Sequence, residues 1–437
     1  MLNTLPHRRA WQIAWPMILS NISVPLMGLA DTAMLGHLDS PAYLGAVALG
    51  ANLIALLYWM FAFLRMGTTA LTGQAYGAGS ALGISLQFVQ ASALALILAL
   101  VLVLLKPWVI PLGLAYMVDD ASLRTLSQAY CDIRIFSAPA VFLNYVILGW
   151  LIGLQNARIP LVITVLANLL NLLLDYIFIV ELGWAHQGAA LATLIAEYTS
   201  LVLGVASLFL YYRKYFNFRW QVIFSALKPL QTLTLNADLF VRTTLLLLVF
   251  NFLMKQSAAQ GEVVLAVNAI ILQLMLFVAF ALDGYAHAAE SMVAEAKGAK
   301  HVRQLHRASL AASLPAIVIA AGLSLLFLFA AQPLLSIMTD QLEIRAEALK
   351  YFYWLSLLPL VSVGCYMLDG IFIGASQTRI MLYLMLISTL LVFFPFWWLL
   401  SGYNNHGLWA AFTLFNFSRT TMMTMAYYFL SRFDHWI

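Results

Sequence analysis

Long apolar runs dominate this chain and leave few folds open to it. Runs of about 20 mostly apolar residues recur along the 437 residues, and 63% of the residues are hydrophobic while only 9% are charged. Each run can cross a bilayer as a helix, because a helix satisfies its own backbone hydrogen bonds where no water is present. The sequence therefore predicts an all-α polytopic membrane protein and excludes a soluble domain.

The hydropathy pattern predicts twelve transmembrane helices, six in each half. The expected starts are Trp11, Leu44, Leu82, Ser127, Ile159 and Gln187, then Thr232, Glu262, Ala308, Tyr351, Ile380 and Gly407. Arg8 and Arg9 precede the first run, but no small-residue cleavage site follows it. The first run is therefore expected to be a retained helix rather than a signal peptide.

One block of the sequence occurs twice. The segment Gly153–Ile159 recurs as Gly374–Ile380, at an offset of 221 residues. Six helices per half is an even number, so both halves should share one orientation and be related by a pseudo-twofold axis along the membrane normal. The predicted organisation is an N-terminal lobe over residues 1–212, a linker over 213–230 and a C-terminal lobe over 231–437.

Basic residues set the expected orientation, because Lys and Arg in short loops resist translocation. With both termini in the cytoplasm, most of the 22 Lys and Arg fall inside. Only five fall outside: Lys106, Arg124, Lys255, Arg345 and Lys350. The net charge of +4 is thereby explained by topology and gives no reason to invoke nucleic acid.

The linker joins basic and aromatic residues. Arg213, Lys214, Arg219 and Lys228 are interleaved with aromatic side chains there. This pattern is typical of an amphipathic connector at the membrane interface, and a merely positive loop is the alternative.

Acidic residues in apolar helices are the first candidate site residues. Asp31 follows a mostly apolar run containing Pro16 and Pro25, and a carboxylate at midplane costs about 2.5–3.5 kcal/mol. Its repeat counterpart is the uncharged Asn251, so the charge belongs to the first half alone. A position at the wet outer end of the helix is the alternative.

A polar stripe marks the fifth predicted helix. Its members, at spacing i, i+3 and i+7, are Asn168, Asn171 and Asp175. They share one face and cannot face lipid. Their counterparts in the second half, at an offset of 221, are Thr389, Val392 and Phe396. The acid is therefore specific to the first half, and interhelical hydrogen bonding that holds the bundle together is the alternative role.

Two further pairs share a helix face at spacing i, i+4. They are Thr193 with Glu197 in the sixth helix and Tyr130 with Arg134 in the fourth. Interhelical hydrogen bonding is an alternative for these as well.

Taken together, these residues resemble the multidrug and toxic compound extrusion (MATE) transporters, in particular the DNA-damage-inducible protein F branch. The resemblance covers nearly the whole chain. In the first half it is carried by Pro16, the string Asp31–Leu38, Tyr130, Asn171, Asp175 and Thr193. In the second half it is carried by Leu282–Gly284, Glu290 and Leu368–Ala375.

The resemblance implies a twelve-helix efflux antiporter whose N-terminal lobe holds the cation site. The residues implied for that site are Asp31, Asn171, Asp175 and Thr193, with Tyr130 beside them, and the first helix is implied to bend near Pro16 on protonation. Glu197, Asp283 and Asp369 are secondary candidates. The chain departs from other branches by placing Val392 and Phe396 on the second-half stripe.

The chemistry of two close acids supports proton coupling. Two carboxylates in a low-dielectric interior cannot both ionise cheaply, so one should bind a proton near neutral pH, and Asp31 is the expected carrier. Its protonation would remove a charge that cationic cargo needs and would free the first helix to repack at Pro16. Sodium is the alternative ion, because the oxygens of Asp31, Asp175, Asn171 and Thr193 would also suit it.

Other functions leave weaker marks. A lipid or headgroup flippase would favour a strongly cationic cavity, whereas acids here at least match the four arginines placed in helices. A membrane enzyme or ATP-driven pump would need a motif such as HExxH, GxSxG or the phosphate loop, and none occurs. Cys131 and Cys365 support neither a disulfide nor a metal site.

The expected protein has no cofactor besides its coupling ion and exports cationic or amphiphilic compounds. We expect a monomer in the bacterial cytoplasmic membrane.

Overall fold

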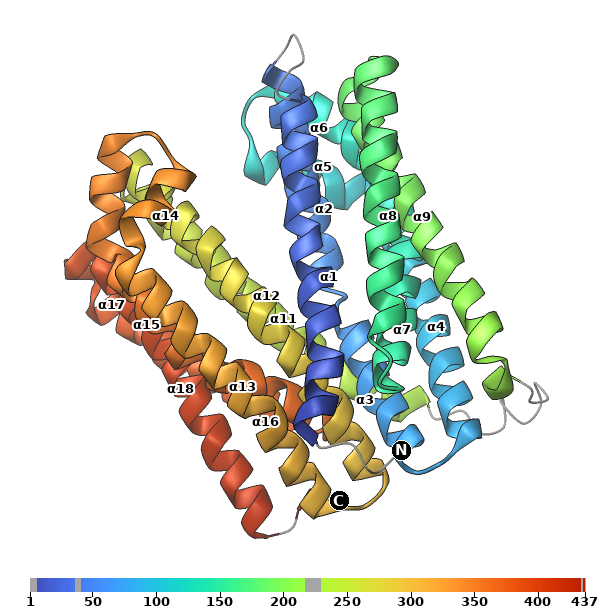
Figure 1. Ribbon diagram of the computed structural model, residues 1–437. Helices are drawn as coiled ribbons and strands as arrows, with labels where there is room; N and C mark the ends of the chain where they lie inside the picture. Colours follow the sequence, from blue (N-terminus) through green and yellow to red (C-terminus); the bar gives the residue numbers. More distant parts are fainter. Residues whose placement is uncertain (1–5, 36–40, 217–228, 434, 437) are drawn as a thin grey trace. The chain divides into compact units, whose positions relative to one another are not determined.

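The computed structural model describes residues 6–35, 41–216, 229–433, 435 and 436, and every regular element in these ranges is helical (Figure 1). The side chain of Asp31 and most of the linker lie outside this description. An all-helical chain is the expected result for apolar runs that must satisfy their own backbone.

The first half contains six helical spans, some of them built from two elements. In order these are α1 (Pro6–Leu35), α2 (Pro41–Trp59) with α3 (Phe63–Gly77), α4 (Ala81–Leu104) with α5 (Lys106–Met117), α6 (Ala121–Arg134) with η1 (Ile135–Ser137) and α7 (Ala138–Gly153), α8 (Arg158–Asp175) with η2 (Tyr176–Glu181), and α9 (Ala185–Tyr211). The short η3 (Arg213–Phe216) follows α9.

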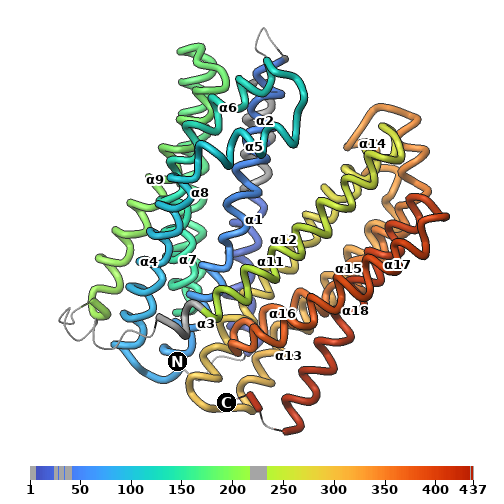
Figure 2. The backbone as a smooth tube through the Cα atoms, turned by 180° about the vertical axis from the view of Figure 1, so that it is seen from behind, coloured from blue at the N-terminus to red at the C-terminus, as the bar shows by residue number. Residues whose placement is uncertain are grey.

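The second half repeats this order with fewer interruptions. Its elements are α11 (Pro229–Ala259), α12 (Glu262–Gly298), α13 (Val302–Phe329) with α14 (Ala331–Met338), α15 (Leu342–Gly374), α16 (Thr378–Ile387) with η4 (Ser388–Phe393), α17 (Phe394–Leu399) and η5 (Ser401–Tyr403), and α18 (Asn404–Arg432). In both Figure 1 and Figure 2, α12 lies beside α15, and α8 lies beside α9 in the first half.

Ten segments of the described residues are long and apolar enough to cross a membrane. Helices α1 and α18, with 30 and 29 residues, are long enough but more polar. Together they give the twelve helices expected. The expected starts were too late at α6, α13 and α15, which begin at Ala121, Val302 and Leu342, because their first turns are polar and lie before the apolar run.

The chain divides into two compact units. One is Leu19–Leu233, and the other combines Met1–Ile18 with Thr234–Ile437. The division differs from the lobes expected at residues 1–212 and 231–437, because the first part of α1 groups with the second half. The unit boundary within α1 falls two residues after Pro16, although α1 is one continuous helix.

Equivalent glycines show that the duplicated sequence gives duplicated packing. A Cβ atom on Gly149 of α7 would overlap the carbonyl oxygen of Arg65 on α3. At the same offset of 221, a Cβ on Gly370 of α15 would overlap the carbonyl oxygen of Ala286 on α12. Small residues allow this close approach of helices in a membrane.

The repeated block forms the same turn in each half. Gln155 and Ser376 both adopt left-handed backbone, with φ of 64° and 51°. Each amide donates to the carbonyl three residues earlier, on Ile152 and Ile373, at 2.8 Å in both cases. The repeat in sequence is therefore a repeat in hydrogen bonding.

The halves differ in helix continuity. In the first half α2 and α3 are separated by a turn in which the Phe61 amide donates to the Tyr58 carbonyl at 2.9 Å, and α6 and α7 are separated by η1. The corresponding α12 and α15 are uninterrupted helices of 37 and 33 residues. These two spans are thus broken in the first half and continuous in the second, whereas the second half has its own breaks between α13 and α14 and from α16 to η5.

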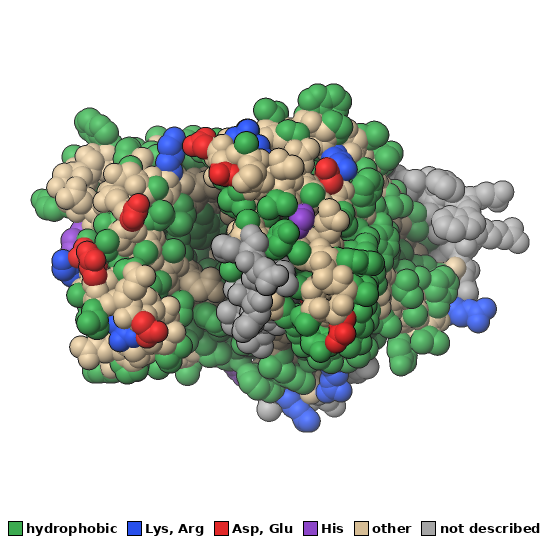
Figure 3. Space-filling view, turned by 90° about the horizontal axis from the view of Figure 1, so that it is seen from above, with side chains coloured by type: hydrophobic (Ala, Val, Ile, Leu, Met, Phe, Trp, Pro, Cys, Tyr) green, Lys and Arg blue, Asp and Glu red, His purple; other side chains and the backbone are tan. Residues whose placement is uncertain are grey.

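Large apolar side chains remain on the outside of the helices, as lipid contact requires. Leu169 and Leu173 of α8 are 57% and 56% exposed. Figure 3 views the molecule from above, where acidic and basic side chains lie among apolar and uncharged polar ones and several of opposite charge are side by side.

The close contact of α12 with α15 is testable. We expect Gly370→Ala to lower the midpoint of thermal unfolding, because overpacking of this kind costs about 1–3 kcal/mol. The measurement is intrinsic tryptophan fluorescence of the protein in detergent. Gly322→Ala is the matched control, because nothing lies within 4 Å of a Cβ there, and an unchanged or raised midpoint is expected. Equal midpoints for the two variants would contradict the packing argument.

Candidate functional site

The polar stripe of α8 faces the inside of its unit. Asn171 and Asp175 are 7% and 0% exposed, whereas Leu169 and Leu173 on the opposite side are more than half exposed. The apolar residues between the polar ones give the helix one side for lipid and one for the bundle. Two of the three residues of the predicted stripe are therefore buried, and Asn168 is half-buried.

Two stripe residues are joined directly. The Nδ2 of Asn171 donates to Oδ2 of Asp175 at 2.8 Å, one helical turn apart. A buried carboxylate needs such donors, since burial without them costs several kcal/mol. The third stripe residue, Asn168, donates through Nδ2 to the Ser23 hydroxyl on the second part of α1 at 2.8 Å. The stripe thus connects α8 to α1.

Irregular helix follows the acid. Asp175 is the last residue of α8, and the π-helix η2 begins at the next residue. In the second half the π-helix η4 includes Thr389, the counterpart of Asn168. Wide turns of this kind occur mostly as single-turn insertions within α-helices and are frequent at functional sites.

Thr193 and Tyr130 have other contacts in the structure. The Thr193 hydroxyl donates to the Ala189 carbonyl of its own helix at 2.9 Å. Tyr130 is 4% exposed, packs against Gly50 of α2, and is hydrogen-bonded to Arg134. Within the described part of the predicted cluster, Asn171 and Asp175 are in direct contact.

Asp31 lies near the end of α1, and its side chain is outside the described residues. Pro16 is buried within the same helix. The ring of Pro16 removes one backbone hydrogen bond inside α1. Pro16 lies next to the boundary between the compact units, and the hinge at this residue stays a prediction.

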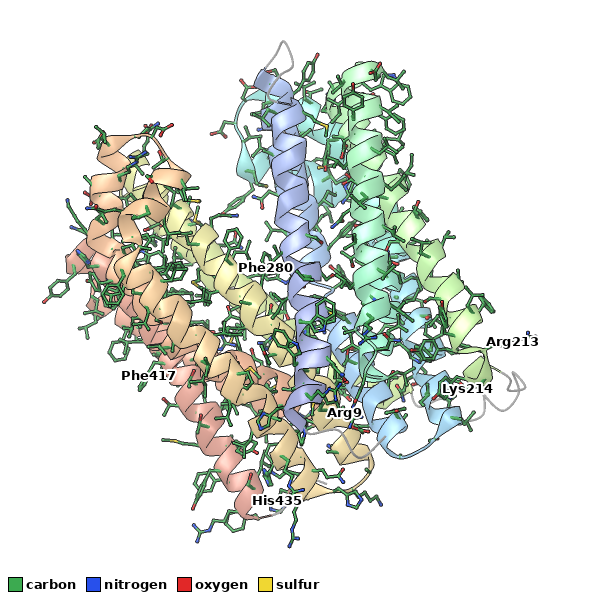
Figure 4. The ribbon with its side chains drawn as sticks, in the orientation of Figure 1. Arg9, Arg213, Lys214, Phe280, Phe417 and His435 are labelled. Carbon is green, nitrogen blue, oxygen red and sulfur yellow. The ribbon has the colours of Figure 1, made fainter. Side chains whose placement is uncertain are left out.

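The first part of α1 contacts α12 through an ion pair and an aromatic contact. Arg9, labelled in Figure 4, forms a 2.9 Å ion pair with Glu295, and the ring of Trp11 lies 6.4 Å from that of Tyr285. Arg213 and Lys214, also labelled, follow the end of α9. The two parts of α1 thus have separate anchors, Glu295 for the first and Asn168 for the second.

Glu197 belongs to a buried network in the first unit. Asn144 Nδ2 donates to the backbone carbonyl of Glu197 at 3.1 Å and lies 3.5 Å from Oε2. Arg134 is close enough to interact electrostatically with Glu197 and donates to the Ser137 hydroxyl at 2.9 Å. Tyr58 donates to the Arg134 carbonyl at 2.8 Å, which satisfies the backbone where α6 passes into η1.

The secondary candidates of the second half have different surroundings. Asp369 is paired with two arginines, Arg242 and Arg419. Asp283 lies near Tyr366 and interacts with it electrostatically. In addition, the buried Glu290 lies 3.7 Å from Nδ1 of His287.

Sequence reasoning counted the arginines in the helices but did not find their partners. Arg242 is 127 residues from Asp369 in sequence and Arg419 is 50 residues from it. The presence of Arg242 and Arg419 in apolar segments was the available signal. Within the described residues, no three His, Cys, Asp or Glu side chains form a metal-binding group.

Comparisons with known proteins agree with this architecture. The family model MatE matches residues 16–177 and 239–399, one match in each half. DNA damage-inducible protein F of Escherichia coli K12 is 39% identical over 425 residues, which cover 94% of this chain and 90% of that protein. Multidrug and toxin extrusion protein 1 of Homo sapiens is 29% identical over 72% of this chain and 55% of its own length.

Solved structures are similar over nearly the whole chain. A crystal structure of MATE in the bent conformation has a TM-score of 0.86 at 22% identity and covers 99% of this chain and 96% of its own. A eukaryotic MATE transporter has a TM-score of 0.87 at 17% identity, with coverages of 96% and 95%. These likenesses confirm the predicted twelve-helix, two-lobe fold.

The Asn171–Asp175 contact leads to a stability prediction. We expect Asn171→Leu to lower the thermal midpoint, because a buried acceptor that loses its donor costs about 1–3 kcal/mol. Leu173→Ala on the exposed side of α8 is the control and should change the midpoint much less. Tryptophan fluorescence in detergent measures both. An Asn171→Leu midpoint equal to that of the wild type would show that the bond contributes nothing.

Proposed function

Since this chain belongs to the MatE family of multidrug and toxic compound extrusion transporters and is not an enzyme, we propose that it exports cationic or amphiphilic compounds by antiport with a cation. The family membership confirms the resemblance found in the sequence. It also establishes a multi-pass membrane protein. The coupling ion, the cargo and the moving element are the subjects of the proposal.

The observation that carries the proposal is the buried Asn171–Asp175 pair. A carboxylate with no exposed surface in an apolar helix is a costly feature that membrane proteins keep mainly for ion and proton handling. The second half has Val392 and Phe396 at the equivalent positions. Because the second half lacks the Asn171–Asp175 pair, the pair does not belong to the scaffold that both halves share. We therefore assign it to cation coupling.

Protons are the proposed coupling ion. Asp31 is the proton carrier, and Asp175, Asn171, Thr193 and Tyr130 complete the site. Protonation of Asp31 removes the negative charge that a cationic cargo pairs with, so that proton entry and cargo release exclude each other. Sodium is the alternative, because carboxylate, amide and hydroxyl oxygens can ligate it.

Helix α1 is the proposed moving element. The first part of α1 is anchored through Arg9 and the second part through Ser23, with Pro16 between the two anchors. A proline inside a helix lowers the cost of bending there, because one backbone hydrogen bond is already missing. We propose that the protonated state bends α1 at this point and releases the cargo.

The proposed setting is the bacterial cytoplasmic membrane, with both termini in the cytoplasm and the protein acting as a monomer. The distribution of Lys and Arg supports this orientation.

We expect Asp31→Asn to abolish gradient-driven transport, because an amide neither carries a proton nor pairs with a cation. The assay is the uptake of a fluorescent monocationic dye into proteoliposomes under an imposed pH gradient, with empty liposomes as background. Asp340→Asn is the matched control, since it makes the same chemical change on a fully exposed acid. Wild-type rates in the Asp31→Asn protein would overturn the carrier assignment.

The same proteoliposomes distinguish the two ions. We expect dye transport under a pH gradient without sodium and none under a sodium gradient at constant pH. Asp175→Asn should lower the proton-driven rate, because it removes the second acid. Transport driven by sodium alone would contradict proton coupling and leave the cation site to sodium.

A further inference from the structure

Three charged side chains meet inside the second unit. They are Arg242 of α11, Asp369 of α15 and Arg419 of α18. Both arginines use Nη2 to bind the same carboxylate oxygen, Oδ2 of Asp369, and the Arg419 bond measures 2.8 Å. The exposed fractions are 7% for each arginine and 15% for the acid. We call this group the arginine pair with its acid.

The packing of α18 on α15 holds the group in place. A Cβ atom on Gly364 would overlap the side chain of Thr420, so the two helices touch at that point. Thr420 also donates its hydroxyl to the Val361 carbonyl at 2.8 Å. Arg419, the neighbour of Thr420, has its guanidinium 5.4 Å from the centre of the Phe415 ring. Its position is therefore fixed by packing rather than by the ion pair alone.

The arginines have more donors than their acid uses. A guanidinium carries five N–H groups, and each arginine binds Asp369 through Nη2 only. Nε of Arg134 in the other unit is completely enclosed without a partner. By contrast, among the described residues neither Arg242 nor Arg419 has an enclosed nitrogen without a partner. Each arginine side chain keeps 7% of its surface exposed, so the group is not completely enclosed.

The charges of the group do not cancel. Two guanidinium groups and one carboxylate leave a formal charge of +1 within the apolar part of the chain. Asp283 also interacts with Tyr366, a neighbour of Asp369 and Arg419, and counting Asp283 brings the formal charge of the wider region to zero. Charge in such an environment is costly and is kept where it serves a ligand or pathway.

The fold does not need this group. At repeat offsets of 221 and 219, the counterparts of Asp369 and Arg419 are Leu148 and Ser200. The first half packs α7 against α9 with Leu148 and Ser200 at these positions. The arginine pair is therefore an addition specific to the second half, just as the Asn171–Asp175 pair is specific to the first.

We propose that Arg242 and Arg419 bind the anionic head group of an amphiphile, a carboxylate, sulfonate or phosphate, and that Asp369 occupies this site when it is empty. A group with two or three anionic oxygens can accept N–H donors from both arginines, including those that Asp369 leaves unused. The inference rests on the proposed export function for the transport step only, because binding can be measured without any gradient.

The test compares two dyes that share one fluorophore. Dansyl-taurine carries a sulfonate and dansyl-choline a quaternary ammonium, and both are titrated into the full-length protein in uncharged maltoside micelles. We expect dansyl-taurine to bind the wild type, and we expect Arg242→Gln and Arg419→Gln each to weaken its binding by about tenfold or more. Arg432→Gln, on an exposed residue at the end of α18, is the matched control and should bind as the wild type does.

Asp369→Asn gives a change of opposite sign. Removing the charge of the internal anion should strengthen dansyl-taurine binding, since the arginines no longer favour their own acid. An ion cluster that serves only for stability would instead give weaker or unchanged binding. This variant decides the question even where an arginine variant fails to fold, as judged by its gel-filtration profile.

Two further arms identify the source of the anion. If added phosphatidylglycerol displaces dansyl-taurine, a lipid phosphate also fits the site; displacement by free alkyl sulfonate alone points to soluble amphiphiles, and either result supports the anion site. Equal affinities in the Arg242→Gln, Arg419→Gln and Arg432→Gln proteins, or no binding of dansyl-taurine to the wild type, would overturn it. Proton coupling through Asp31 can fail while this binding persists, so the two proposals are tested separately.

Discussion

Contact between helix backbones at glycine is the interaction on which the other features depend. Where α7 meets α3 and α15 meets α12, the glycines Gly149 and Gly370 let a carbonyl oxygen of the facing helix come closer than any side chain would allow. Dispersion and weak polar contacts at this range drive helix association in lipid, where no hydrophobic effect operates between helices. This packing fixes the position of α7 along α3 and of α15 along α12. It thereby also fixes the positions of Asn144 on α7 and Asp369 on α15.

Much of the fold was predictable because lipid allows so few solutions. The apolar runs fixed the helical class, and the block shared by Gly153–Ile159 and Gly374–Ile380 marked a turn whose hydrogen bonds are the same in both halves. Helix starts were less predictable where polar turns precede the membrane. In α6 the helix begins after Asp120, whose carboxylate accepts from the Leu123 amide at 2.7 Å, well before the run becomes apolar.

Part of the candidate site was predictable, because two of its residues are close together in the sequence. Asn171 and Asp175 are one turn apart on a single helix, so sequence alone places them in contact. Arg242 and Arg419 meet Asp369 across three helices, and no local pattern connects residues so far apart in the chain. The two halves thus share a scaffold but differ in the charged residues inside it. The first half has Asp175, which the second half lacks, and the second half has Arg242 and Arg419 bound to Asp369.

The breaks in the first-half helices have a mechanical consequence. The uninterrupted α12 contains no proline, and its continuous backbone hydrogen bonds resist bending along the helix. In the first half the turn between α2 and α3 and the 3-10 segment Ile135–Ser137 divide the corresponding spans into shorter, more compliant rods. At the α2–α3 span, the half that carries the Asn171–Asp175 pair is therefore easier to bend than the corresponding α12 of the second half.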